Sequence, residues 1–444
     1  MNRCLSIRLQ TVSLSTYNRT EYLKIMAAVH KIKTNVIIIG AGPAGASTSI
    51  FLSKKGINHV VIEKEAFPRD KVCGDACSGK TVHVLRKADP TWLDEIFQAP
   101  EAFAPSYGLI IGAPNGKEIA IPFKPDRLQG EYAAGFTSTR MRLDQYLFSK
   151  LNPAHSTIFQ NSHVKKLERT GDTVKVSFNQ KEMEFEVEAQ LVVGADGAQS
   201  IVRKTFLNDQ FHPKQPSPGI RAYYRNITGF HPESFIELHF LPALLPGYFW
   251  MFPLPDGAAN VGIGMPSKVL REKKINLKAV LQDIIKHHPK IAPRFSEAIM
   301  IDKITGWTLP LFTGNQPISG DRFLLAGDAA NLIDPFTREG IGKALFSGMI
   351  AADTVCNALE AHQFDKASIK RQYDDILHLQ IGSELKTSMI LQRLCRHQGL
   401  FNFLISKATR SPTLSGTLNA MLSNVDLRKQ LYKPSFYLKI LLNQ

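Results

Sequence analysis

The sequence predicts an α/β protein in which a parallel sheet with helices is joined to an antiparallel sheet and followed by a C-terminal helical region. Three observations lead to this prediction. A β-branched run at residues 35–39 enters a glycine-rich turn and a helix of small residues, and the next apolar run closes on Glu63. Residues 211–300 contain alternating apolar and polar runs, as half-buried strands do. After about residue 361 the pattern becomes helical.

The turn after the first strand has the spacing Gly-x-Gly-x-x-Gly. Gly40 permits the tight turn, Gly42 lets the backbone approach a pyrophosphate, and Gly45 lets the helix pack on the strand. The helix N-terminus offers free N–H groups and the positive end of its dipole to phosphates. Glu63 stands 18 residues after Gly45, where a carboxylate accepts hydrogen bonds from ribose hydroxyls. The pattern therefore predicts a Rossmann-like site for FAD or NAD. Its expected contacts are Gly40, Gly42, Ala44, Gly45, Glu63 and Lys64.

Two later strands each end in an aspartate. One ends in Gly-Ala-Asp-Gly at residues 194–197, and the other ends in Gly-Asp at residues 327–328, before a glycine-rich helix start at residues 340–342. An aspartate at the carboxyl end of a strand can hold a ribose or ribityl hydroxyl. The helix start can direct N–H groups at the negative charge on the pyrimidine ring of a reduced flavin. Asp196 also suits a plain β-turn, so we expect it to support the site structurally.

The order of these three motifs resembles the flavoprotein superfamily that includes p-hydroxybenzoate hydroxylase. More narrowly, residues 68–75 (Pro-Arg-Asp-Lys-Val-Cys-Gly-Asp) and residues 327–337 are similar to the geranylgeranyl reductase family. Blocks at residues 137–144 and 246–262 add to this likeness, which covers about residues 34–360. The resemblance implies that FAD is the cofactor, bound by a domain of the glutathione reductase and p-hydroxybenzoate hydroxylase type.

The resemblance also implies roles for individual residues. The glycine turn and Glu63 would bind the ADP part of FAD. Arg140 would lie near the pyrophosphate and the ribityl chain, and Asp328 would hold a flavin-side hydroxyl. The turn at residues 340–342 would face the isoalloxazine ring through Gly340, Ile341 and Gly342.

Two residues expected near the flavin leave alternatives open. Arg338 stands where the family commonly has glycine. It would favour an anionic reduced flavin if its charge is close, or strain the backbone if φ is positive there. Cys73 is the catalytic candidate, as a thiol beside the ring or as an exchange pair with Cys77; the alternative is two ordinary thiols in a loop. Five cysteines make no disulfide framework, and none completes a zinc set, so we expect no metal site.

Residues 248–252 carry an aromatic side chain at every second position. In a strand Tyr248, Trp250 and Phe252 share one face, where they can line an apolar substrate pocket; the alternative is plain core packing. We expect their sheet to form one wall of that pocket. The predicted organisation is a flexible basic extension at 1–33, an FAD-binding domain from 34–100, 135–210 and 301–360, a substrate domain from 101–134 and 211–300, and C-terminal helices at 361–444.

The 444 residues carry a formal net charge of +15, concentrated at the two ends. Residues 1–33 have a net charge of +5 and residues 385–444 of +8, so the middle is nearly neutral. A core without a basic patch argues against a nucleic-acid partner. The N-terminal segment fits a transit peptide or an extension upstream of a start at Met26. The basic and apolar C-terminal region fits an interface with anionic lipid headgroups, or a helical cap on the cofactor domain.

The resemblance to the geranylgeranyl reductase family, together with the basic and apolar C-terminal region, implies an FAD-dependent oxidoreductase that reduces carbon–carbon double bonds of an isoprenoid (geranylgeranyl-type) lipid. Because the sequence has a single Gly-x-Gly-x-x-Gly unit, electrons would come from transiently bound NAD(P)H or from a protein such as ferredoxin. The alternatives are a flavin-dependent monooxygenase or halogenase acting on an apolar or aromatic substrate, and a binding protein that uses flavin structurally. No apolar run approaches the length of a membrane span. Because the five cysteines make no disulfide framework, reduced thiols are the default, and we expect a cytoplasmic protein that can lie peripherally on a membrane.

Overall fold

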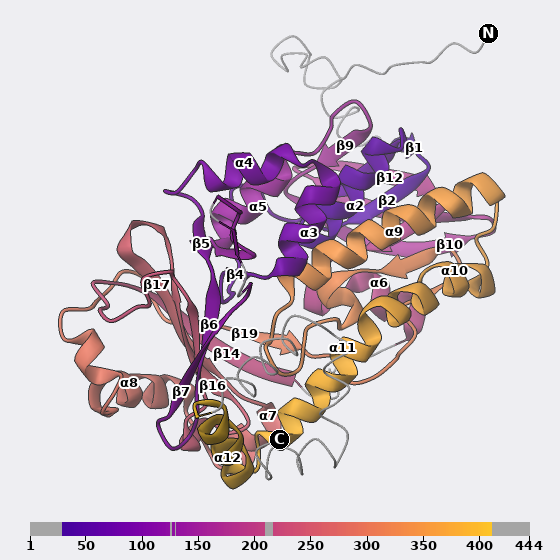
Figure 1. Ribbon diagram of the computed structural model, residues 1–444. Helices are drawn as coiled ribbons and strands as arrows, with labels where there is room; N and C mark the ends of the chain where they lie inside the picture. Colours follow the sequence, from indigo (N-terminus) through magenta and orange to yellow (C-terminus); the bar gives the residue numbers. More distant parts are fainter. Residues whose placement is uncertain (1–28, 125–126, 129, 209–215, 411–444) are drawn as a thin grey trace.

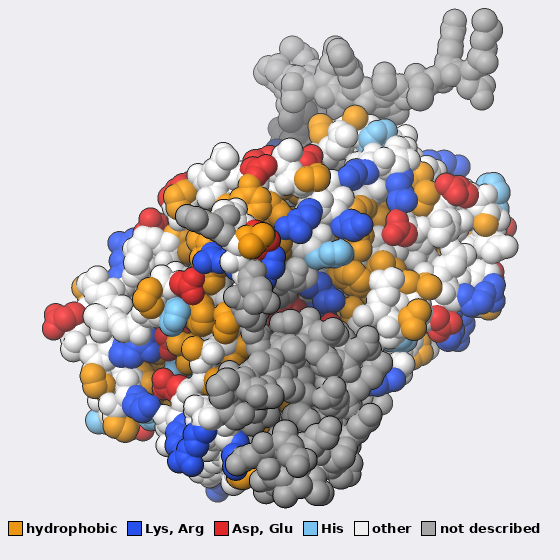
Figure 2. Space-filling view, viewed as in Figure 1, with side chains coloured by type: hydrophobic (Ala, Val, Ile, Leu, Met, Phe, Trp, Pro, Cys, Tyr) orange, Lys and Arg blue, Asp and Glu red, His pale blue; other side chains and the backbone are white. Residues whose placement is uncertain are grey.

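The computed structural model describes residues 29–124, 127–128, 130–208 and 216–410. These residues form two lobes, each built on its own main sheet (Figure 1). In one lobe α2 (Pro43–Lys54) and α9 (Ile341–Ala361) cover a parallel sheet, and in the other α8 (Leu277–His287) and α12 (Gln398–Ala408) flank the largest sheet. Hydrophobic side chains reach the surface in the region between the lobes (Figure 2).

The central strands of the parallel sheet are short β-branched runs that are buried on both faces. Its order within the described residues is β20 (Ser319–Gly320), β21 (Phe323–Leu325), β13 (Leu191–Gly194), β2 (Val36–Ile39), β3 (His59–Ile62) and β9 (Ser156–Phe159). The central strand β2 is fully buried and pairs in parallel with β13 and β3. The edge strand β20 runs antiparallel to β21.

Helices α2 and α9 pack closely because they meet through small residues. Ser47 Oγ donates to Leu345 O at 2.7 Å, and Thr48 Oγ1 donates to Gly348 O at 3.2 Å. The close contact fixes the starts of the two helices relative to each other, and both starts belong to predicted cofactor motifs.

The largest sheet in the described chain has eight strands drawn from two distant segments. Its order is β18 (Ile299–Met300), β14 (Pro216–Arg225), β17 (Ala258–Gly264), β16 (Tyr248–Pro253), β15 (Ile236–His239), β6 (Gly108–Gly112) and β7 (Glu118–Pro122), with β19 (Thr305–Pro310) also paired to β14. Phe249 and Met251 of β16 join the core on the α8 side. Tyr248, Trp250 and Phe252 face the opposite way, so the prediction that these three share a face is confirmed.

Two segments differ from the predicted ranges. β1 (His30–Lys33) lies in the expected flexible extension, and that expectation is wrong for these residues. Ile32 packs on the core, and β1 pairs in parallel with β12, in a sheet of order β1, β12 (Met183–Ala189), β11 (Thr173–Gln180) and β10 (Ser162–Thr170). Residues 1–28 lie outside the described chain. β19 lies in a range assigned to the cofactor domain, yet its ladder partner is β14.

The α/β fold with a second sheet and helical C-terminal region is confirmed, although β15 and β6 of that sheet pair in parallel. A small sheet contains β4 (Ala76–Cys77), β8 (Gly135–Thr137) and β5 (Ala104–Ser106). The other helices are α3 (Gly79–Ala88), α4 (Thr91–Phe97), α5 (Arg140–Ser149), α6 (Ile201–Leu207), α7 (Ser267–Glu272), α10 (Lys366–Gln372) and α11 (Asp374–Leu394). Of the predicted C-terminal helical region, residues 411–444 lie outside the described chain.

None of the described helices is long and apolar enough to cross a membrane.

Candidate functional site

The glycine-rich turn after β2 has a backbone that excludes larger residues at two positions. Gly40 has a φ of +96°, which other residues rarely adopt, and a Cβ there would overlap the carbonyl group of Ala195. A Cβ on Gly45 would overlap the carbonyl oxygen of Gly40. Ala44, next to Gly45, is buried. The turn therefore holds the start of α2 against the carboxyl ends of β2 and β13.

The N-terminus of α2 is suited to an anion. Gly42 is its N-cap residue and offers no side-chain cap to the first N–H groups. The guanidinium of Arg69 lies beside Gly42, 3.4 Å from where a Cβ would stand. Arg69 and Arg140 both donate to Asp144, at 2.9 Å and at 2.7–2.8 Å. Arg69 Nε also lies 3.9 Å from Glu63 Oε1, so the two arginines face two carboxylates. The open helix start and its dipole favour a pyrophosphate, and Arg69 lies beside that start.

Glu63, directly after β3, is buried beside the same turn. Its Oε2 accepts a hydrogen bond from Ala41 N at 2.6 Å, and its Oε1 accepts one from Glu65 N at 3.1 Å. These bonds fix the carboxylate at the edge of the parallel sheet where the sequence predicts the ribose. Lys64 is exposed, and no partner for its side chain is found among the described residues.

Asp328 and Asp196 occupy different surroundings. Asp328 lies in the 3-10 turn η6 (Gly327–Ala330), and Lys71 Nζ donates to its Oδ2 at 2.9 Å. Sequence reasoning gave Lys71 no role, because no local pattern links positions so far apart. Asp196 Oδ2 accepts a hydrogen bond from Ile201 N at 2.6 Å, at the start of α6. This contact within the protein frame fits the supporting role expected for Asp196.

The start of α9 faces a large cavity through Gly340 and Ile341. Gly342 N donates to Glu339 Oε1 at 2.5 Å. Lys343 Nζ donates to the other oxygen of Glu339 at 3.1 Å. Burial acts against the charged lysine, but nearby carboxylates raise the pKa of Lys343 above its ordinary value. Lys343 Nζ also donates to Glu384 Oε1 at 3.0 Å, so two carboxylates neutralise its charge beside the helix start.

This cavity has a volume of about 640 Å³ and is lined by residues of both lobes, a size within the range of small-molecule sites. The aromatic face of β16 forms part of its mostly apolar wall, so Tyr248, Trp250 and Phe252 line one space. Tyr248 OH donates to Thr337 O at 2.6 Å, and Trp250 Nε1 donates to Asn260 Oδ1 at 2.8 Å. The polar tips are satisfied by protein, which leaves the rings as apolar lining.

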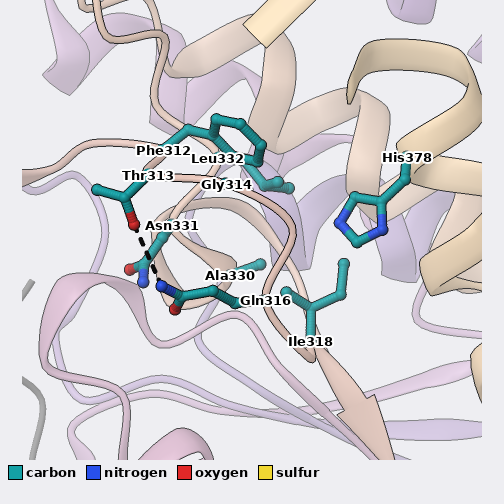
Figure 3. A pocket seen from close by; sticks show the side chains of 9 residues that line it. All are labelled: Phe312, Thr313, Gly314, Gln316, Ile318, Ala330, Asn331, Leu332 and His378. Atoms are coloured by element: carbon teal, nitrogen blue, oxygen red, sulfur yellow. Dashed lines mark hydrogen bonds between the residues drawn. The ribbon is translucent and has the colours of Figure 1, made fainter. Parts of the chain in front are cut away.

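A second, much smaller cavity of about 10 Å³ lies beside η6 (Figure 3). Gln316 Nε2 donates to Thr313 Oγ1 at 3.2 Å on one side of it, and His378 of α11 stands on the other. This space has room for about one water molecule. The large cavity is therefore the candidate active site.

Cys73 and Cys77 both line the large cavity, and both thiols are free. Cys73 is partly exposed, whereas Cys77 is buried. Burial raises the pKa of the Cys77 thiol well above its ordinary value. A thiol held in its protonated form is a poor nucleophile in exchange. The geometry therefore favours Cys73 alone over a Cys73–Cys77 pair.

Sequence reasoning missed Asp75, which is fully buried in the loop of Cys73. Its Oδ2 accepts hydrogen bonds from Tyr223 OH at 2.7 Å and Asn260 Nδ2 at 2.8 Å. Asn260 Nδ2 also donates to Cys73 O at 2.7 Å. Desolvation raises the pKa of Asp75 to about 6, although these hydrogen bonds act to lower it. The Gly-Asp pair at the end of the block 68–75 was the only local signal for this residue.

Arg338 has a φ of +57°, so it occupies a left-handed backbone position that favours glycine. Of the two alternatives for this departure from the family, the strained backbone is present. The guanidinium packs on Tyr248, with 4.5 Å between Cζ and the ring centroid.

The residues present fit FAD. The open start of α2 and the two arginines suit its pyrophosphate, Glu63 suits a ribose, and the start of α9 stands at an apolar cavity that suits a flavin ring.

Comparison with known proteins agrees with this assignment. The FAD binding domain family matches residues 33–346, more than half of the chain. Digeranylgeranylglycerophospholipid reductase 2 of Methanopyrus kandleri is 26% identical over 362 residues, which cover 80% of this chain and 85% of the relative. The fold is similar to that of a geranylgeranyl bacteriochlorophyll reductase-like protein from Thermoplasma acidophilum, with a TM-score of 0.74, 21% identity, and coverage of 90% of this chain and 99% of the other.

The fold is also shared with a triple mutant of a flavin-dependent brominase, with a TM-score of 0.70, 19% identity, and coverage of 90% of this chain and 98% of the other. Fold alone therefore does not separate reductases from halogenases. The match to the FAD binding domain family and the reductase relatives do identify the class: the chain belongs to the FAD binding domain family and is an FAD-dependent oxidoreductase.

Proposed function

We propose that the protein reduces carbon–carbon double bonds of an isoprenoid lipid bound in the large cavity. One observation carries the proposal: a single mostly apolar cavity is lined by the aromatic face of β16, the loop of Cys73 and the start of α9. An apolar chain lying there would meet the residues expected around the flavin. The relatives named as digeranylgeranylglycerophospholipid reductases support a prenyl lipid as the substrate class.

Each part of the wall has a task in this proposal. Tyr248, Trp250 and Phe252 would hold the prenyl chain against flat apolar surfaces and exclude water. The turn at residues 40–45, with Glu63, Arg69 and Arg140, would hold the ADP part of the cofactor. Asp328 and the start of α9 would hold its flavin part. FAD, when bound, supplies the hydride chemistry.

Saturating a double bond also requires a proton. Cys73 and Asp75 bring a thiol and a carboxyl group to the cavity wall. Because Cys73 is the partly exposed one of the two, we assign it the catalytic position that meets the substrate. Asp75 is held behind it by hydrogen bonds to the eight-stranded sheet.

The source of electrons and the place of action complete the proposal. We infer NAD(P)H or a ferredoxin-like protein as the donor, because the sequence has no second Gly-x-Gly-x-x-Gly unit for a nicotinamide domain. We also infer that the basic C-terminal region contacts an anionic membrane surface, where a prenyl lipid would be found.

The decisive test is an anaerobic assay of chemically reduced holoenzyme with a prenyl diphosphate, a prenyl quinone and a prenyl glycerolipid. Mass spectrometry should find two added hydrogen atoms per reduced double bond in at least one of them. Cys73→Ser should lower that turnover while keeping full FAD content.

A dioxygen-dependent enzyme would behave in the opposite way. If all three substrates stay unchanged without oxygen, and an aromatic substrate is hydroxylated or halogenated when oxygen is admitted, the monooxygenase or halogenase alternative replaces this proposal.

A further inference from the structure

Arg338 contributes a guanidinium to the wall of the large cavity without an acidic partner among the described residues. Its Nη1 and Nη2 atoms are buried and make no hydrogen bond there. Its Nε donates only a long hydrogen bond, of 3.3 Å, to Ser217 Oγ. A buried charge without a partner is costly, and an arginine in such a place normally meets an anion.

The two acids on the same loop are engaged elsewhere. Asp334 accepts hydrogen bonds from the N–H groups of Phe336 and Thr337 through one oxygen and from Ser388 Oγ through the other. Glu339 is paired with Lys343 and with the start of α9. Neither carboxylate neutralises Arg338.

The backbone at this position favours a residue other than arginine. At a φ of +57° glycine would be free of strain, so arginine carries a conformational cost here. Other residues of the described chain share a positive φ, among them Lys181 and Lys274, but Arg338 combines it with a guanidinium on the cavity wall.

We propose that Arg338 is an anion-binding residue of the cavity and pairs with the phosphate or other oxyanion of a prenyl substrate. A guanidinium with two free Nη atoms can bind such a group in a bidentate manner. The prenyl chain in this proposal rests on the proposed function, but the anion site itself does not.

The position of the guanidinium favours the substrate over the cofactor as its partner. Arg338 packs on Tyr248 and bonds Ser217, which belong to β16 and β14 of the eight-stranded sheet. Gly342, in the start of α9 that is expected to face the flavin, lies near Ser78 at the start of α3, whose Oγ is 2.7 Å from where a Gly342 Cβ would stand. The charge is therefore directed toward the aromatic wall of the cavity.

The test is a binding titration of oxidised holoenzyme with geranylgeranyl diphosphate and with the neutral geranylgeraniol, followed by tryptophan fluorescence. Arg338→Gln should weaken diphosphate binding about ten- to a hundred-fold, the range of a charge-assisted hydrogen bond, and change geranylgeraniol binding less than about twofold. Arg338→Gly should show the same selective loss with a backbone free of strain, so a folding defect cannot imitate the result. Arg338→Lys should keep part of the preference.

The matched control is Arg86→Gln, which removes one exposed positive charge of α3 and should leave both affinities unchanged. Inorganic diphosphate should bind much more weakly than the prenyl form, and equal binding would overturn the assignment of a prenyl anion. An unchanged ratio of diphosphate to alcohol affinity in Arg338→Gln would also overturn it. A lower flavin midpoint potential with that unchanged ratio would assign Arg338 to the reduced cofactor instead.

Because this readout needs no turnover, it separates the two proposals. A preference for diphosphate that depends on Arg338 supports the anion site even if no double bond is reduced in the anaerobic assay.

Discussion

The two lobes prepare their parts of the site in different ways. The lobe of the parallel sheet does so mainly with backbone: Gly40 and Gly45 allow a close turn, and the start of α2 presents N–H groups. The lobe of the eight-stranded sheet does so with side chains, through the aromatic face of β16 and the hydrogen bonds behind it. Backbone requirements leave glycines in the sequence, whereas the long-range hydrogen bonds behind the aromatic face leave no such local pattern. The first lobe is therefore far easier to recognise than the second.

Gly45→Ala tests the backbone requirement of the first lobe and has the largest expected effect. The added Cβ overlaps the carbonyl oxygen of Gly40, which is backbone and cannot turn aside. We expect a loss of about 3 kcal/mol or more in the free energy of unfolding and loss of bound FAD. Thermal unfolding and the flavin content of purified protein measure both effects. Gly399→Ala is the control, because nothing lies near its Cβ position in α12, and it should be neutral or slightly stabilising. Full FAD content in Gly45→Ala would contradict the close-turn argument.

The side-chain lobe can be tested through the pH dependence of Asp75. Burial raises its pKa from 3.8 to about 6. Between these values the folded protein keeps a proton that the unfolded chain has released, so the stability of the protein falls as pH rises through this window. Asp75→Asn cannot titrate at this position. Relative to that variant, the free energy of unfolding of the protein should fall by about 3 kcal/mol as the pH rises across this window. Urea unfolding of both proteins across this range measures the difference, and parallel curves would show that Asp75 titrates normally.

A smaller effect compares the two faces of β16. Trp250→Phe removes the donor to Asn260 Oδ1 and leaves a buried acceptor unpaired, which should cost about 1–2 kcal/mol and raise KM for a prenyl substrate. Phe249→Leu, on the α8 side, should cost about 1 kcal/mol and leave KM unchanged. Denaturant unfolding and steady-state kinetics separate the two. Equal effects on KM would mean that the cavity face has no special part in substrate binding.

The smallest expected effect concerns Lys64, in the lobe of the parallel sheet. Lys64 was predicted to contact the cofactor, but its side chain is exposed. Lys64→Ala should therefore change stability by less than about 0.5 kcal/mol and leave the Kd for FAD nearly unchanged. A flavin-binding titration checks this, and a clear loss of affinity would restore Lys64 to the cofactor site.

Prediction from sequence succeeded where a local pattern carries the physical requirement. The glycine turn and the fold class followed from short motifs, and FAD followed from the family resemblance that these motifs carry. The alternation of β16 correctly placed its three aromatic residues on one face. It failed where the requirement is long-range. Asp75 meets Asn260 across 185 positions, and Lys71 meets Asp328 across 257, so neither pair has a signature in either segment alone. The strand β1 was missed because its four residues lie in a basic segment. So short a run of alternating residues does not distinguish a strand from a flexible extension.

The hydrogen bonds that run from Trp250 through Asn260 and Asp75 to Tyr223 join the loop of Cys73 to three strands of the other lobe, β16, β17 and β14. This connection limits how the protein can be recombined with its relatives. A chimera that exchanged residues 216–264 alone would set foreign donors against an unchanged Asp75. Substrate preference should therefore transfer between relatives only when residues 72–77 are exchanged together with that sheet. The loop and the sheet then act as one structural unit, although they are far apart along the chain.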